Sequence, residues 1–273
     1  MISKSLARNL VLPTILFSLA GLLSCQKLTD VMRPFMLSED QEVELGDQFK
    51  AQILSDTETY PPYTGSQKVT DFVDSLGQYL ASVQTDRPDL KFTFTIIDDD
   101  EQVNAFAIPG GHVFVYTGLL KNMKNASELA GVLAHEIGHI TQYHGADKMV
   151  QGNALELVNT IFFNESDSAS ITGAIAGLLE NMVFLSFSRK DEFEADSCAL
   201  AYSINADISP EGMKDFLAFL KSEYGDQPKI FEPMSTHPLL SDRIKKINAI
   251  ISKSSDVPDD MYENEYSKIK GLI

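Results

Sequence analysis

The chain has 273 residues, 44% of them hydrophobic, and a formal net charge of −17 at pH 7. This length and hydrophobic content predict one domain with a well-buried core. The acidic charge excludes nucleic acid as a partner, because phosphate binding requires a basic surface that displaces counterions.

Residues 1–24 are typical of a bacterial export signal. Lys4 and Arg8 precede the uncharged run LVLPTILFSLAGLLS, which is shorter than the roughly 20 apolar residues of a membrane-spanning helix. The run ends in LLSC, which resembles a lipobox, so we expect Cys25 to be lipidated and residues 25–37 to form a tether. An ordinary cleaved signal and a retained anchor are the alternatives. With Cys25 used in this way, Cys198 cannot form an internal disulfide and is expected to be a small buried hydrophobe.

Helices and a small sheet are predicted next along the chain. SEDQEVELGDQFKAQIL begins with a plausible cap at Ser38 and has apolar residues at helical spacing, and QKVTDFVDSLGQYLASV repeats that pattern. KFTFTII alternates polar and apolar residues, and GHVFVYT is rich in β-branched and aromatic residues. Both patterns indicate strands. Between them, residues 104–111 are expected to form a strand that enters a Pro-Gly-Gly turn.

The stretch from Leu129 to His144, LAGVLAHEIGHITQYH, carries three of the five histidines. Asn125 and Glu128 resemble a capping box ahead of apolar residues at helical spacing, so HEIGH is predicted to lie on a helix. His135 and His139 then share one face and can bind one zinc ion, with Glu136 beside them as the general base. Two imidazoles packed without partners in an apolar helix would be costly, which disfavours a purely structural role. His112 and His144 are expected to be supporting or structural.

A catalytic zinc site normally has a third protein ligand, and SRKDEFEADSCALAY is the strongest region for it. Glu192 and Asp196 are four residues apart, so on a helix one can bind the metal while the other accepts the ring N–H of a ligating histidine. Glu194 is expected to point elsewhere. A solvated acidic helix start is the alternative for this region.

HEIGH at 135–139, EFEAD at 192–196, NAFAIPGGHVFVYTGLL and STHPLLSDRI together resemble the gluzincin peptidases, which include the CAAX prenyl protease, HtpX and the mitochondrial Oma protease. The likeness spans Ser38 to about Ile250, and it is greatest to the small periplasmic lipoprotein members. It implies one zinc ion per chain with Glu192 as the third ligand, and it implies Glu136 and Asp196 as catalytic residues. It further implies cleavage of misfolded or misassembled envelope proteins.

The resemblance also suggests roles near the cleft. Asn104, Ala105 and Phe106 are expected to form an edge strand that pairs with an extended substrate. His237 is expected to be an inhibitory fourth ligand, an oxyanion stabiliser or a structural loop residue. Arg243 is expected to steady a substrate carbonyl or oxyanion, to pair with a nearby carboxylate, or to lie on a helix surface.

Together these observations predict a mostly helical α+β, zincin-like (gluzincin) domain over residues 38–252, with a small sheet beside the active-site helix and an acidic tail over 253–273. The expected function is that of a zinc endopeptidase of the bacterial cell envelope, which acts in protein quality control on unfolded or misassembled proteins. We expect a lipid anchor at Cys25 facing the periplasm, with the outer membrane favoured over the inner. The alternative is a holding or assembly factor with a latent zinc site, but a structural zinc has no use for a base such as Glu136.

Overall fold

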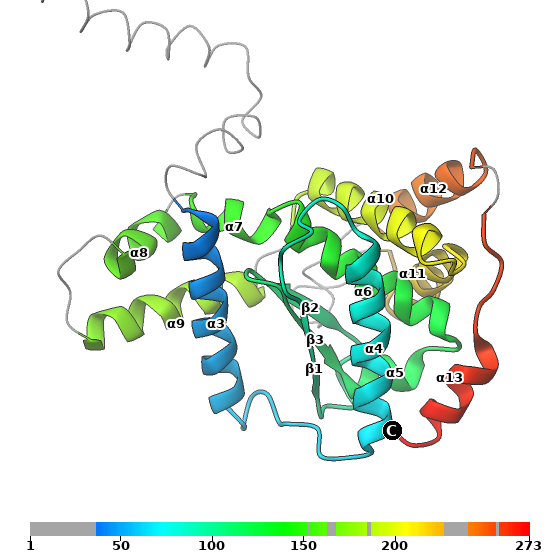
Figure 1. The fold of residues 1–273 in the computed structure, drawn as a ribbon, viewed down its shortest axis with the longest axis horizontal. Coiled ribbons are helices and arrows are strands. Elements are labelled where there is room, and N and C mark those ends of the chain that lie inside the picture. The colour runs from blue at the N-terminus through cyan, green and yellow to red at the C-terminus, as the bar shows by residue number, and fades with distance from the viewer. Residues whose placement is uncertain (1–36, 152, 163–167, 185–186, 227–239, 255–256) are drawn as a thin grey trace, which may run out of the picture.

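The computed structural model describes residues 37–151, 153–162, 168–184, 187–226, 240–254 and 257–273 (Figure 1). The export signal, the lipidation site Cys25 and the loop residue His237 lie outside the described residues. Within the described part of the chain, no helix is both long and apolar enough to cross a membrane.

Helices surround a small mixed sheet. The strands are β1 (Thr93–Ile97), β2 (Ala105–Ile108) and β3 (His112–Tyr116), arranged in the order β1-β3-β2 with β1 parallel and β2 antiparallel to β3. The helices are α3 (Glu39–Ser55), α4 (Gln67–Val83), α5 (Thr117–Asn122), α6 (Ala126–Thr141), α7 (His144–Met149), α8 (Asn153–Phe162), α9 (Ser168–Phe184), α10 (Arg189–Asn205), α11 (Glu211–Tyr224), α12 (Leu240–Ile251) and α13 (Glu263–Lys270). The predicted fold class, mostly helical with a small sheet beside the histidine helix, is confirmed.

The two faces of the sheet are covered by different helices (Figure 1). Val113 and Val115 of β3 enter the larger core with α4, α6, α10 and α11, whereas Phe114 enters a second core with α3, α8 and α9. This division follows from strand geometry, because successive side chains point to opposite faces. Both faces are therefore buried, and the edge of the sheet is formed by β2 on one side and β1 on the other.

The turn between β2 and β3 holds α3 against the sheet. Gly110 and Gly111 have φ values of 82° and 94°, which is the left-handed region that favours glycine. A Cβ on Gly46 of α3 would lie 2.1 Å from the carbonyl oxygen of Pro109, so only glycine permits this approach. Ser38 caps α3 through a capping box with Gln41, which agrees with the predicted helix start.

The C-terminal residues pack against the domain. The side chain of Tyr266 in α13 is fully buried in the larger core, and its hydroxyl donates to the carbonyl of Leu120 at 2.6 Å. The backbone N–H of Ser127, at the start of α6, also donates to the carbonyl of Met261. Within the predicted acidic tail over 253–273, the described residues thus include a helix that packs on the domain through Tyr266.

Candidate zinc site

Helix α6 presents the HEIGH residues from within the core. The side chain of Asn125 accepts from the backbone N–H of Glu128, and the carboxylate of Glu128 accepts from the N–H of Lys124 at 2.7 Å. These bonds satisfy donors at the helix start. Every residue of α6 is buried, including His135, Glu136 and His139, so the helix holds these three polar side chains away from bulk water.

Helix α10 brings the acidic residues against α6 at a glycine. A Cβ on Gly138 would lie 2.9 Å from the Cβ of Cys198 and 3.1 Å from the carbonyl oxygen of Ala195, so the glycine of HEIGH permits this close contact. Ser188 caps α10 through a capping box with Asp191, which places Glu192 in the first turns of the helix. Cys198 itself is half-buried and free, and burial raises the pKa of its thiol.

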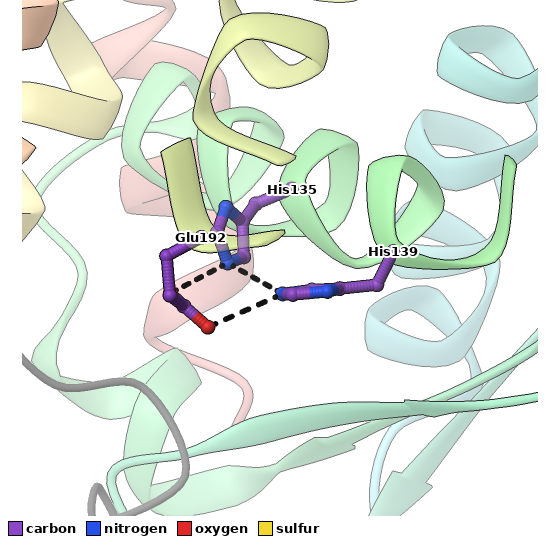
Figure 2. A group of neighbouring side chains, drawn as sticks. All are labelled: His135, His139 and Glu192. Carbon is purple, nitrogen blue, oxygen red and sulfur yellow. Dashed lines mark hydrogen bonds and ion pairs between the residues drawn. The ribbon is translucent and has the colours of Figure 1, made fainter. Parts of the chain in front are cut away.

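The structure brings His135, His139 and Glu192 together, with all three side chains buried and with one ligand atom from each within 4.8 Å of the others. Figure 2 shows both imidazoles and the carboxylate pointing toward one another from two helices. The Nε2 atoms of the two histidines are 3.1 Å apart, and each lies 3.6 Å from an oxygen of Glu192. The alternative of a solvated acidic helix start is wrong, because Glu192 and Asp196 are both buried.

This donor set fits zinc. Two imidazole nitrogens and one carboxylate oxygen are the protein ligands of a common class of catalytic zinc sites, which keep a further position open. Calcium or magnesium would require a shell of oxygen ligands, and the group supplies two nitrogens. The converging Nε2 atoms and the buried carboxylate therefore form a site for one zinc ion.

An ionic network holds the His135 side of the group. A carboxylate oxygen of Asp196 lies 3.1 Å from Nδ1 of His135, which is the contact that the four-residue spacing predicts. Arg243 of α12 binds Asp196 through Nε at 2.9 Å and through Nη2 at 2.7 Å, and its Nη1 lies 2.8 Å from Glu192. Arg243 is 2% exposed, so the surface-helix alternative is wrong and its guanidinium lies on the two carboxylates.

The charges of this network shift its pKa values in opposite directions. Burial and the charge of Arg243 lower the pKa of His135, but hydrogen bonds to Asp196 and Glu192 outweigh them and raise it to about 9. Burial raises the pKa of Asp196, yet Arg243 and His135 hold it below its usual range. With a pKa of about 9, His135 is protonated at neutral pH in the metal-free protein, so zinc binding must displace that proton.

Aromatic rings hold the His139 side. Nδ1 of His139 lies 2.9 Å from Nδ1 of His144, and the ring of Phe187 is stacked on His139 with centroids 4.0 Å apart. Nε2 of His144 lies 3.7 Å from a carboxylate oxygen of Glu194, and burial lowers the pKa of His144. Sequence reasoning left Glu194 and Phe187 without a role here. The five-residue spacing of the two histidines was the available signal, but it does not match a continuous helix.

The start of β2 forms a pocket beside Glu136. Asn104 and Ala105 line this pocket of about 30 Å³ together with His135, Glu136 and Arg243, and apolar side chains of α11 close it. Phe106 points to the opposite face of the sheet, where its ring stacks on Phe114 with centroids 5.0 Å apart. A second, smaller pocket at the other end of β2 is lined by Ala107, Pro109, His139 and Phe187. The two ends of the edge strand therefore border two pockets, one lined by His135 and the other by His139.

Two histidines one turn apart on a buried helix, with a carboxylate from a second helix, are the ligand arrangement of a zincin-type metalloprotease. Comparison with known proteins agrees with this class, since residues 68–251 match the peptidase family M48. The chain therefore belongs to this peptidase family.

Curated relatives share the domain within longer proteins. The beta-barrel assembly-enhancing protease of Escherichia coli K12 is 31% identical over 220 residues, which cover 76% of this chain and 43% of the relative. The mitochondrial metalloendopeptidase OMA1 of Schizosaccharomyces pombe is 37% identical over 160 residues, which cover 58% of this chain and 46% of the relative. The chain thus spans less than half the length of these curated relatives.

Proposed function

We propose that this protein is a zinc metalloendopeptidase that hydrolyses peptide bonds of unfolded or misassembled proteins in the bacterial cell envelope. The observation that carries this proposal is the position of Glu136, which lines one pocket with His135 and the start of the edge strand β2. A base, candidate metal ligands and a strand edge at one pocket are the parts that peptide-bond hydrolysis requires.

In this proposal, His135, His139 and Glu192 hold the zinc ion. Zinc, when bound, supplies Lewis acidity that polarises the scissile carbonyl and acidifies water. Glu136 takes the proton of the attacking water and returns it to the leaving amine, so that the proton count balances over the reaction. Asp196 orients His135, and Arg243 holds Asp196 and Glu192 in place while it lines the same pocket.

The edge strand supports an unfolded polypeptide as the substrate. Backbone N–H and C=O groups along the edge of β2 can pair with an extended chain largely without regard to its sequence. In a folded β-barrel the backbone groups of the strands are already paired with neighbouring strands, whereas the unfolded precursor has free backbone groups that can pair with β2. The name of the E. coli relative refers to β-barrel assembly, which supports precursors of envelope β-barrels as substrates.

The envelope location also belongs to this proposal. Residues 1–24 have the pattern of an export signal, and LLSC supplies Cys25 for lipidation, which would anchor the domain to a membrane facing the periplasm. Metabolic labelling with a radioactive fatty acid should label the wild-type chain and not the Cys25→Ser variant. Equal labelling of the two would remove the anchor from the proposal.

The activity is tested with the full chain, purified in detergent, on a β-barrel precursor diluted from urea. Wild type should cleave the unfolded precursor and spare the same barrel folded in detergent, and a chelator should stop cleavage. Glu136→Gln should lower the rate by about 10²- to 10⁴-fold, the usual contribution of a general base, while still binding one zinc ion.

Two results would contradict the proposal. Cleavage of the folded barrel as fast as the unfolded one would exclude recognition through a strand edge. A zinc-loaded wild type that cleaves no unfolded protein would instead favour a holding factor with a latent site.

A further inference from the structure

A break in the helix places a second histidine behind His139. In a continuous helix, a residue five positions on would lie about 140° around the axis from His139. Helix α6 ends at Thr141 instead, and Tyr143 has a left-handed backbone with φ 60° and ψ 22° before α7 begins at His144. This left-handed residue turns the chain back, so that Nδ1 of His144 lies 2.9 Å from Nδ1 of His139.

The contact between the two imidazoles fixes where the protons lie once zinc is bound. Nε2 of His139 faces the other two candidate ligands, at 3.1 Å from His135 and 3.6 Å from Glu192. With Nε2 on the metal, the neutral ring of His139 carries its proton on Nδ1. Two N–H groups cannot face each other at 2.9 Å, so Nδ1 of His144 must be the acceptor and its own proton must lie on Nε2.

We propose that His144 and Glu194 are positioning residues of the zinc site: His144 accepts a hydrogen bond from Nδ1–H of His139 and directs its Nε2–H toward the carboxylate of Glu194. The proposal rests on the zinc ligands of the proposed function and assigns roles to two residues outside the ligand set. Partners of this kind fix the orientation and tautomer of a metal-bound histidine.

Several contacts support this arrangement. His144 is 3% exposed, and within the described part of the chain no acceptor lies within hydrogen-bond distance of its buried Nε2. A carboxylate oxygen of Glu194 lies 3.7 Å from this Nε2, and the side chain of Glu194 is 40% exposed, so a small rotation can shorten the distance. Phe187 stacks on His139 and lies at 6.0 Å from the ring of His144, which limits rotation of both rings.

Each acidic residue of EFEAD then has a separate task at the site. Glu192 is the candidate ligand, Asp196 contacts His135, and Glu194 faces His144 behind His139. The two histidines are thus oriented through Nδ1 from the same helix, one directly and one through a third imidazole.

The first experiment measures zinc affinity of the full chain in detergent by competition with a chelator of known affinity. His144→Leu removes the acceptor and should weaken zinc binding by about 10- to 100-fold, the usual effect of losing such a partner. His144→Gln can still accept from Nδ1–H of His139 and should stay within about threefold of wild type. Glu194→Gln should weaken binding by up to roughly tenfold, at the lower end of that range.

Two matched controls separate this role from general damage. His112→Gln replaces another buried histidine that also lies near a carboxylate, Asp47 at 3.2 Å, but far along the chain from the site. Lys190→Gln removes the exposed lysine that lies 3.8 Å from Glu194. Both controls should bind zinc as wild type does.

The second experiment reads the protons directly. Histidine-selective ¹⁵N labelling and long-range ¹H–¹⁵N correlation of the zinc-loaded wild type should show His139 protonated on Nδ1 and His144 protonated on Nε2 only. A His144 ring that is protonated on Nδ1, or on both nitrogens, would overturn the proposal. So would a folded His144→Leu variant with unchanged zinc affinity. If that variant does not fold, the tautomers of the wild type decide.

These readouts are separate from peptidase activity. The expected tautomers and affinities in a protein that cleaves nothing would uphold this inference and refute the proposed function. An active protein in which His144 carries its proton on Nδ1 would uphold the proposed function and refute this inference.

Discussion

The two histidines of the HEIGH stretch lie in different surroundings. His135 is held by a buried ionic network in which Arg243 binds Asp196 with two hydrogen bonds. His139 is held by the neutral ring of His144 and by the stacked ring of Phe187, and the carboxylate behind them is 40% exposed. The contacts of His135 therefore both position this candidate ligand and stabilise the fold, whereas the contacts of His139 mainly orient its ring.

The physical reason for this difference is the cost of an unpaired charge. Removing one member of a buried ion pair leaves the other without compensation in a medium of low dielectric constant. Removing a neutral ring costs packing and one hydrogen bond, and the neighbouring groups can partly relax. Substitutions on the two sides should therefore separate loss of folding from loss of metal affinity.

The largest effect is expected for Asp196→Asn. This change leaves the buried guanidinium of Arg243 without its two-point partner, and the free energy of unfolding should fall by about 3–5 kcal/mol. Urea unfolding of the metal-free protein measures this loss. Glu194→Gln, on the other side and half-exposed, should cost less than about 1 kcal/mol in the same assay. Equal losses for the two variants would contradict the comparison.

Zinc removal should have the next largest effect. The metal-free protein should remain folded, because the buried guanidinium of Arg243 contacts both Glu192 and Asp196. Free zinc at 100 times its dissociation constant should add about 2.7 kcal/mol to the free energy of unfolding, and a chelator should reverse this gain. Calorimetry with and without a chelator measures the shift. Complete unfolding by the chelator would show that the ionic network cannot hold the site without metal.

A smaller effect is expected for Phe187→Leu. The substitution removes the ring stacked on His139, and such aromatic contacts contribute about 0.5–1.5 kcal/mol beyond their buried area. Zinc affinity should therefore fall by less than about tenfold, while urea unfolding of the metal-free protein changes little. A loss of folding as large as that of Asp196→Asn would show that the aromatic side is also structural.

The sequence predicted the ionic side of the site better than the aromatic side. Four-residue spacings within two helices suffice to place His135 near His139 and Glu192 near Asp196, because α-helical geometry is regular. The contact of His144 depends on Tyr143 adopting a left-handed backbone, which is uncommon for a residue other than glycine. The periodicity of apolar residues in the sequence does not predict such a turn.

The C-terminal residues show the same limit for the fold. The composition of these residues predicted only an acidic tail, whereas in the structure Tyr266 of α13 is buried in the larger core and donates a hydrogen bond to Leu120. The helix lies past the end of the family match at residue 251, so composition was the main guide there. Composition does not predict whether a single residue such as Tyr266 packs against a distant part of the chain, because that contact depends on the tertiary structure.

The smallest effect extends the comparison to a buried histidine outside the site. His112 lies 2.9 Å from the hydroxyl of Thr93 and 3.2 Å from the exposed carboxylate of Asp47, a setting similar to that of His144 and Glu194. Burial, aided by the charge of Lys50, lowers the pKa of His112 below its usual 6.5, against the weaker pull of Asp47. The exposed carboxylate of Asp47 thus does not raise the pKa of the buried imidazole above its usual value.

The sign of the pH effect follows from linkage. The unfolded chain binds a proton at this histidine below about pH 6.5, where the folded protein does not. The contribution of His112 to stability is therefore present above pH 6.5 and is lost as the pH falls through the lower pKa of the folded state. His112→Gln should remove this slope, so urea unfolding between pH 8 and 5 should show wild type losing stability relative to the variant. A wild type that gains stability over the variant on acidification would mean that the exposed carboxylate prevails, and the same conclusion would then apply to Glu194.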